Sequence, residues 1–185
     1  MAQTFKDPLL SIARGVIFIV QAVLAFAAVM LTVGAPLVVF LQERITAELR
    51  AEYGDPAAQF PVLALTGLLL LALLVVGLSW LFLRHLRRII DTVGDGDPFV
   101  PANAERLTAM AWLMLAVQAL AIPLGALGLY IGTFSEYIGT FSDNPNVLAD
   151  IDLDLSGIVL VVTLFILARV FRLGAAMRDD LEGTV

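Results

Sequence analysis

The residues that could do chemistry are few in this chain of 185 residues, and none lies in a pattern that supports catalysis. The single histidine, His85, lies within Arg84-His-Leu-Arg-Arg88, with no serine, cysteine or metal-ligand partner at a recognisable spacing. The sequence contains no G-x-S-x-G elbow, phosphate-binding loop or H-E-x-x-H helix. We therefore predict that the protein is not an enzyme and has no catalytic residue and no cofactor. We interpret His85 as part of a basic collar at headgroup level.

Two acidic groups resemble the start of a metal site. The three aspartates of segment 150–154 have the i, i+2, i+4 spacing of a calcium loop. However, Leu155 occupies the position of the required glycine, and no glutamate follows at position twelve. The aspartates of segment 91–97 are followed directly by Pro98, which argues against a ligand loop there. We predict no metal site and interpret both groups as solvated acidic surface.

The composition indicates a membrane protein. Hydrophobic residues make up 60% of the chain, charged residues 15%, and the mean hydropathy is +0.94. Soluble domains are about 45–50% apolar and about 25% charged. These values exclude a soluble globular domain, a disordered chain and a protein that binds nucleic acid directly through a broad basic face. The absence of cysteine also excludes a disulfide or a thiolate metal site.

Charge-free runs predict four membrane spans. Residues 15–42, 56–83 and 107–135 contain no charged side chain, and each run exceeds the roughly 20 residues that a spanning helix needs. The fourth run, 155–168, is shorter, but apolar residues continue to Leu173, and Arg169 and Arg172 can snorkel. We predict an all-α, four-transmembrane-helix bundle, a single membrane domain over residues 1–185. Its expected spans are about 15–42, 61–83, 107–131 and 153–173. An interfacial fourth helix and a cleaved signal peptide are the alternatives.

The distribution of arginine and lysine predicts the orientation. The N-terminal tail, the loop 84–106 and the segment 169–185 hold nine of the eleven basic residues. The segments on the other side sum to a charge of −7. Because basic residues are retained on the cytoplasmic side, we expect both termini to be cytoplasmic. The outer loops would then be 43–60 and 132–152, and the cytoplasmic tail 174–185.

Capping residues predict the helix ends. Asp7-Pro8 reads as the start of the first helix and Gly54 as its stop, and Asp55-Pro56 repeats the start signal. We expect the second helix to reach Val93 and to be broken by the glycines and proline of segment 94–98. The third helix should begin near 101–103, with the side chain of Asn103 capping its free N–H groups.

A tandem repeat, Tyr-Ile-Gly-Thr-Phe-Ser-Glu/Asp, fills residues 130–143. Its alternation, and that of residues 150–155, suits a small outer hairpin of strands. If the segment is helical instead, both copies lie on one face of the helix. A third interpretation is a recent sequence duplication that has no functional role. Nearby, Gly128 and Gly132 form a small-residue motif that suits packing within the bundle or dimerisation. The sequence therefore allows a homo-oligomer without requiring one.

Two segments on the predicted cytoplasmic side are distinctive: Gly96-Asp-Pro-Phe-Val-Pro-Ala-Asn-Ala-Glu-Arg-Leu107, and the C-terminal segment from Ala168 to Val185. With the four spans, they resemble a bacterial family of small four-helix inner-membrane proteins of unknown function. Members of that family are often encoded beside a Cro/Xre-type helix-turn-helix regulator. The resemblance implies a multi-pass protein of the bacterial inner membrane and a DNA-binding regulator as its cytoplasmic partner.

The leading hypothesis is therefore a non-enzymatic regulatory or accessory protein that docks a cytoplasmic partner. Its predicted surface consists of Asp97, Phe99, Asn103, Arg106, Phe171, Arg172, Gly174, Arg178 and Asp179. Headgroups of the lipid bilayer would contact Arg84, Arg87 and Arg88, since anionic lipids attract basic residues near the surface. The alternative is a small transporter or channel for a neutral or hydrophobic solute, with a path lined by Gln21, Gln118 and threonines. Both distinctive segments could equally serve only to join the helix ends.

Overall fold

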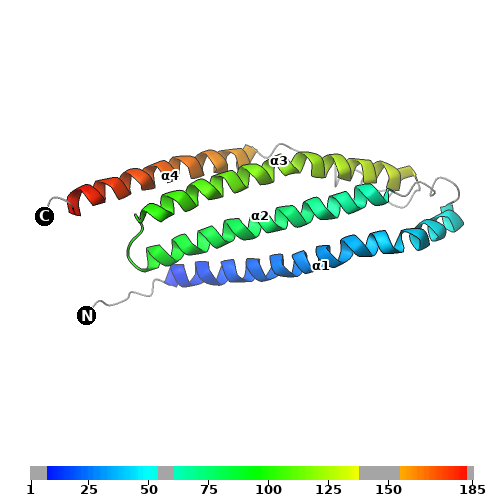
Figure 1. The fold of residues 1–185 in the computed structure, drawn as a ribbon, viewed down its shortest axis with the longest axis horizontal. Helices are drawn as coiled ribbons and strands as arrows, with labels where there is room; N and C mark the ends of the chain where they lie inside the picture. The colour runs from blue at the N-terminus through cyan, green and yellow to red at the C-terminus, as the bar shows by residue number, and fades with distance from the viewer. Residues whose placement is uncertain (1–7, 54–60, 138–154, 183–185) are drawn as a thin grey trace. The chain divides into compact units, whose positions relative to one another are not determined.

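The fold, a computed structural model, is all-helical over the residues that it describes, which are 8–53, 61–137 and 155–182 (Figure 1). These residues form four helices and no strand: α1 (Pro8–Tyr53), α2 (Val62–Gly94), α3 (Pro101–Tyr137) and α4 (Leu155–Glu182). All four are long and apolar enough to cross a membrane. The predicted fold class is confirmed, and the chain is a multi-pass membrane protein.

Most helix ends fall where the capping residues predict them. The first helix begins at Pro8 and continues for 46 residues to Tyr53, and the third begins at Pro101. The start signal at Asp55-Pro56 lies outside the described residues, and α2 itself begins later than that signal predicts, at Val62. The carbonyl oxygen of Pro61 accepts the first helical hydrogen bond, from the amide of Leu65 at 2.9 Å. A proline also disfavours helical geometry in the residue before it.

The predicted outer hairpin is also wrong for the first copy of the repeat. Helix α3 continues without interruption to Tyr137, so residues 130–136 are helical. The reason is local, because a short strand needs a partner for its backbone groups, whereas a continuing helix satisfies them within the segment. The second copy and the aspartates of 150–154 lie outside the described residues.

The chain divides into two compact units. The first, here called the arginine-rich unit, comprises residues 1–25, 78–117 and 155–185, and the second comprises 26–77 and 118–154. The arginine-rich unit contains the start of α1, the end of α2, the start of α3 and all of α4. Both described chain ends therefore belong to the same unit, as four antiparallel spans require.

The core of the arginine-rich unit joins three helices. Leu107, Met110 and Ala111 of α3 are buried against Leu164 and Ala168 of α4. The half-buried side chains that pack on this cluster are Phe82, Leu86, Ile89, Met114, Phe165 and Phe171. Because the cluster includes residues of α2, α3 and α4, it fixes these helix ends side by side.

The second unit is packed through small residues. Gly67 of α2 lies so close to α3 that a β-carbon there would meet Leu127 Cδ1 at 3.5 Å. Gly128 of α3 is buried and Gly132 is half-buried. This burial supports packing within the chain, since small residues let helix backbones approach closely. Large hydrophobic side chains such as Phe40 and Leu63 are exposed, as lipid-facing residues are expected to be.

Candidate functional site

The connection between α2 and α3 is a tight, specified turn. The amides of Gly96 and Asp97 donate to the carbonyl oxygens of Val93 and Thr92, both at 3.1 Å. This pair of bonds is the Schellman arrangement, which needs a left-handed residue directly after the helix. Gly96 occupies that position with φ of +84°. A side chain there would be strained, so glycine is the residue that the turn requires.

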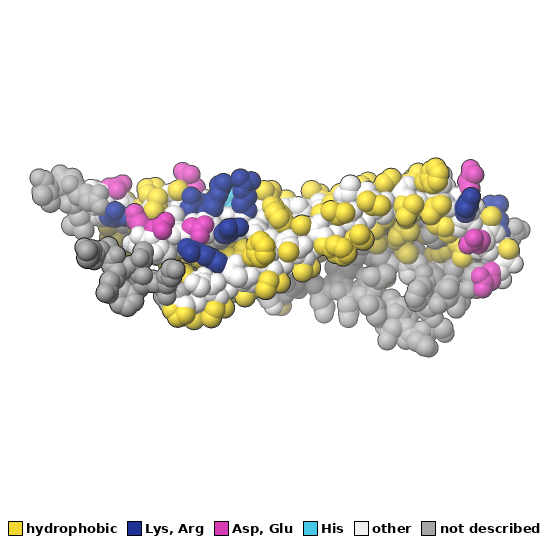
Figure 2. All heavy atoms as spheres, turned by 90° about the horizontal axis from the view of Figure 1, so that it is seen from below, with side chains coloured by type: hydrophobic (Ala, Val, Ile, Leu, Met, Phe, Trp, Pro, Cys, Tyr) yellow, Lys and Arg dark blue, Asp and Glu magenta, His cyan; other side chains and the backbone are white. Residues whose placement is uncertain are grey.

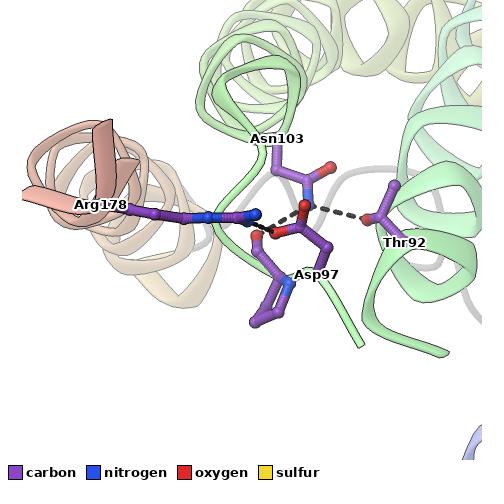
Figure 3. Close-up of polar contacts among 5 residues, drawn as sticks. Thr92, Asp97, Asn103 and Arg178 are labelled. Atoms are coloured by element: carbon purple, nitrogen blue, oxygen red, sulfur yellow. Dashed lines mark hydrogen bonds and ion pairs between the residues drawn. The ribbon is translucent and has the colours of Figure 1, made fainter. Parts of the chain in front are cut away.

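Asn103 is the buried centre of this connection (Figure 3). Its side chain is 0% exposed, and its Nδ2 donates to Thr92 Oγ1 at 2.8 Å and to the Pro98 carbonyl at 2.9 Å. Its Oδ1 accepts a hydrogen bond from Arg106 Nη1 at 2.8 Å. The amide side chain thus joins the end of α2, the connection and the start of α3.

The expectation that the Asn103 side chain caps α3 is wrong. The carbonyl oxygen of Val100 accepts from the Asn103 amide at 2.8 Å, so Asn103 already lies inside the first turn. Its side chain is directed away from the free helical N–H groups and toward α2 and the connection. A buried amide needs most of its donors and acceptors satisfied, and the connection supplies the partners.

The connection is also joined to α4. Arg178 forms an ion pair with Asp97 (Figure 3). The ring of Phe99 lies 5.3 Å from that of Phe171, tilted by 41°. Gly174 makes room for the same ring, since a β-carbon there would lie only 2.6 Å from Phe99 Cδ1. The missing side chain of Gly174 thus admits the aromatic side chain of the connection.

Seven of the nine residues predicted for the cytoplasmic surface therefore share one network of contacts. They are Asp97, Phe99, Asn103, Arg106, Phe171, Gly174 and Arg178. Arg106 also donates to the Arg88 carbonyl at 3.2 Å and so joins α3 to α2. The two others, Arg172 and Asp179, are exposed on α4. Because Asn103 is fully buried, it can act on a partner only through its neighbours.

A second ion pair joins α1 to α2 and was missed from the sequence. Arg14 Nε lies 3.0 Å from Asp91 Oδ1, with both side chains about half exposed. The side chain of Arg14 also covers Gly94, where a β-carbon would lie 2.8 Å from Arg14 Nη2. The available signal was an arginine near the start of one span and an aspartate near the end of the next. Two antiparallel helices bring such positions together.

The three arginines predicted to contact headgroups lie near His85 on the last turns of α2. Figure 2 shows dark blue basic side chains gathered around the cyan histidine. Arg84, Arg87 and Arg88 are exposed, and within the described part of the chain no carboxylate pairs with their side chains. His85 is half-buried, and its Nδ1 has no hydrogen-bond partner among the described residues. The contact with lipid stays a prediction.

An open groove of about 410 Å³ lies between α3 and α4 and was not predicted from the sequence. Its lining residues are Thr108, Phe165, Ile166, Ala168, Arg169 and Arg172. Phe165 also contacts Trp112 of α3, with the two ring centres 5.6 Å apart and the rings nearly perpendicular. The groove combines an apolar wall with two guanidinium groups.

The acidic residues that resembled a metal site have other roles where they are described. Over residues 8–53, 61–137 and 155–182, no three histidine or acidic side chains gather at a spacing that suits a metal ion. Asp91 and Asp97 instead pair with different arginines, on α1 and α4. These two carboxylates therefore act as connections between helices.

Residues 45–185 match the model of a protein family that carries the description "Protein of unknown function (DUF2975)". The match includes the end of α1 and all of α2, α3 and α4, so it covers the contact network of Asn103 and the groove. Neither a curated protein nor a solved structure matches the chain.

Proposed function

We propose that this chain, which belongs to the DUF2975 family, is a regulatory or accessory protein of the bacterial inner membrane that docks a cytoplasmic protein on its arginine-rich unit. The partner that the family resemblance suggests is a helix-turn-helix regulator. Docking would hold such a regulator at the membrane, and release would return it to DNA. The protein itself would contribute a binding surface and no reaction.

The observation that carries this proposal is the rigid joint between the connection and α4. Asp97 and Phe99 hold the connection against α4 through an ion pair and an aromatic contact, and the buried amide of Asn103 holds it against α2. A surface that is fixed before binding loses less conformational entropy when a partner docks. The joint thus supplies a preorganised platform.

Exposed apolar residues next to this joint would anchor the partner protein. Met177 is 62% exposed and Leu173 56% exposed, one helical turn apart on α4. Four charged residues of the last turns, Arg178 to Glu182, favour water over hydrocarbon as the surroundings of this helix end. Exposed methionine beside charged residues is typical of protein-binding surfaces. The adjoining exposed carboxylate of Asp179 favours a basic partner surface, which a DNA-binding protein carries.

Two of the threonines that would line the path of the transport alternative have their hydroxyl donors engaged. Thr32 and Thr163 donate to the carbonyl oxygens four residues earlier in their own helices, at 2.7 Å each. Their donors are thus already used within the helix.

Binding of a purified regulator tests the proposal. The regulator encoded nearest to this gene would be titrated against the full chain in lipid nanodiscs. We expect Met177→Asp to weaken binding at least tenfold, because truncating a central anchor typically costs about 2 kcal/mol or more. The control Ala47→Asp adds the same charge at an exposed position of the second unit and should bind like the wild type. Absence of binding by the intact chain, or equal loss in both variants, would contradict the proposal.

The expected orientation is tested separately. Because the chain has no cysteine, a single cysteine placed in the tail 174–185 is a unique label site. An impermeant maleimide should react with it only after the cells are opened. Reaction in intact cells would place the tail outside and would refute a cytoplasmic partner.

A further inference from the structure

We propose that the groove between α3 and α4 binds one anionic phospholipid, with its phosphate on Arg169 and Arg172 and the upper part of an acyl chain along Phe165 and Ile166. This site differs from the expected headgroup contacts of α2. It is also independent of the docking proposal, since the groove does not include Met177 or the connection.

The two arginines are the first reason. Arg169 and Arg172 are exposed, lie one turn apart and both line the groove. Among the described residues no carboxylate pairs with either of them, whereas Arg14 and Arg178 each have an aspartate. Two guanidinium groups on one wall can bind the oxygens of a single phosphate with paired, charge-assisted hydrogen bonds.

The depth of the groove in the bilayer is the second reason. On α4 the charge-free run ends at Ala168, and on α3 it begins at Leu107. Both residues belong to the same buried cluster, and Ala168 lines the groove. The groove therefore lies where the apolar parts of two helices meet their polar ends, which is the level of the phosphates. Unpaired arginine at the edge of the hydrocarbon favours an anionic partner.

The remaining wall indicates what the lipid must look like. Phe165 and Ile166 offer an apolar surface that continues from the arginines toward the membrane-spanning part of α4. Thr108 Oγ1 donates to the Ala104 carbonyl at 2.8 Å, so toward the groove its oxygen can only accept. An acceptor beside a phosphate site fits a headgroup that carries hydroxyl donors. The geometry thus favours a glycerol headgroup, as in phosphatidylglycerol, over a headgroup without a donor.

Native mass spectrometry of the full chain tests the site. Protein released from detergent micelles would be titrated with phosphatidylglycerol, with phosphatidylcholine of the same acyl chains, and with inorganic phosphate alone. We expect one tightly retained phosphatidylglycerol, at least tenfold weaker retention of phosphatidylcholine, and no stable adduct with phosphate. Equal retention of the two lipids would overturn the proposal. A phosphate adduct that resists competition by phosphatidylglycerol would show a free-anion site and would overturn it too.

Two pairs of variants locate the lipid. The double variant Arg169→Gln/Arg172→Gln should retain phosphatidylglycerol at least tenfold more weakly. The control Arg44→Gln/Arg50→Gln removes the same charge from exposed positions of α1 and should leave retention unchanged. Equal loss in both would show attraction by net charge alone and would refute the groove. A dimer mass that replaces the lipid adduct would show that a second copy fills the groove, and would refute it as well.

A further variant tests the groove independently, in case the double variant misfolds. Ile166→Trp fills the groove and leaves both arginines in place, so we expect it to reduce retention by a similar factor. The far-UV circular dichroism of each variant should match that of the wild type. Unchanged retention in a folded Ile166→Trp protein would exclude the groove as the site.

Discussion

Replacing Asn103 by alanine should destabilise the arginine-rich unit by about 3 kcal/mol. The substitution removes two neutral hydrogen bonds, to Thr92 and Pro98, which contribute about 1 kcal/mol each, and one from the Arg106 guanidinium, which contributes about 1.5–3 kcal/mol. The higher helix propensity of alanine offsets at most about 0.7 kcal/mol. Because the side chain is 0% exposed, water cannot replace the lost partners without opening the connection.

The free energy of unfolding can be measured in mixed micelles, by titrating a mild detergent with dodecyl sulfate and following helicity. The matched control is Thr32→Ala, which removes a hydrogen bond that lies within α1 and is exposed. We expect the control to change the free energy by less than about 0.5 kcal/mol. Asn103→Asp keeps the acceptor for Arg106 but sets a carboxylate against the Pro98 carbonyl, and should also cost more than about 1 kcal/mol. Equal values for Asn103→Ala and Thr32→Ala would refute the central role of this amide.

Three further predictions concern the connection and the contacts that join its surroundings to α1 and α4. Gly96→Ala should lower stability by about 1 kcal/mol in the same titration, because φ is +84° there. Arg14→Gln should cost only about 0.2–1 kcal/mol, less at high salt, since the pair with Asp91 is about half exposed; a loss above 2 kcal/mol would show a stronger role. Gly174→Ala should displace the Phe99 ring and forfeit an aromatic contact of about 0.5–1.5 kcal/mol. Chymotrypsin should then cut after Phe99 about 2- to 12-fold faster, and an unchanged rate would contradict the close packing.

The sequence predicts the elements well because their signals are local. Pro8, Tyr53 and Pro101 bound their helices as the caps and the apolar runs indicate. Each of these signals involves residues within one or two turns of one another. The two-residue alternation of segment 130–136 predicted a strand, but the segment continues α3, in which the backbone groups are satisfied within the helix.

The contacts between helices are less predictable, since they depend on which faces meet. Seven of the predicted surface residues do contact one another. They lie in the connection, at the start of α3 and near the end of α4, and these three parts of the chain pack together. Their partners were not predicted from the sequence: Gly174 contacts Phe99, and Arg14 pairs with Asp91. The groove has no sequence signal at all, because α3 and α4 each supply only one side of it.

The connection between α2 and α3 is contacted from two directions, and this has a consequence for communication along the chain. Helix α1 contacts Asp91 and Gly94 in the last turn of α2, just before the connection. Helix α4 contacts Asp97 and Phe99 within the connection. We expect that loosening one of these attachments changes the free energy of the other, since both join residues 91–99, the end of α2 and its connection to α3. A protein bound to the C-terminal helix would therefore alter hydrogen exchange at the beginning of α1, although the two segments are more than a hundred residues apart in sequence.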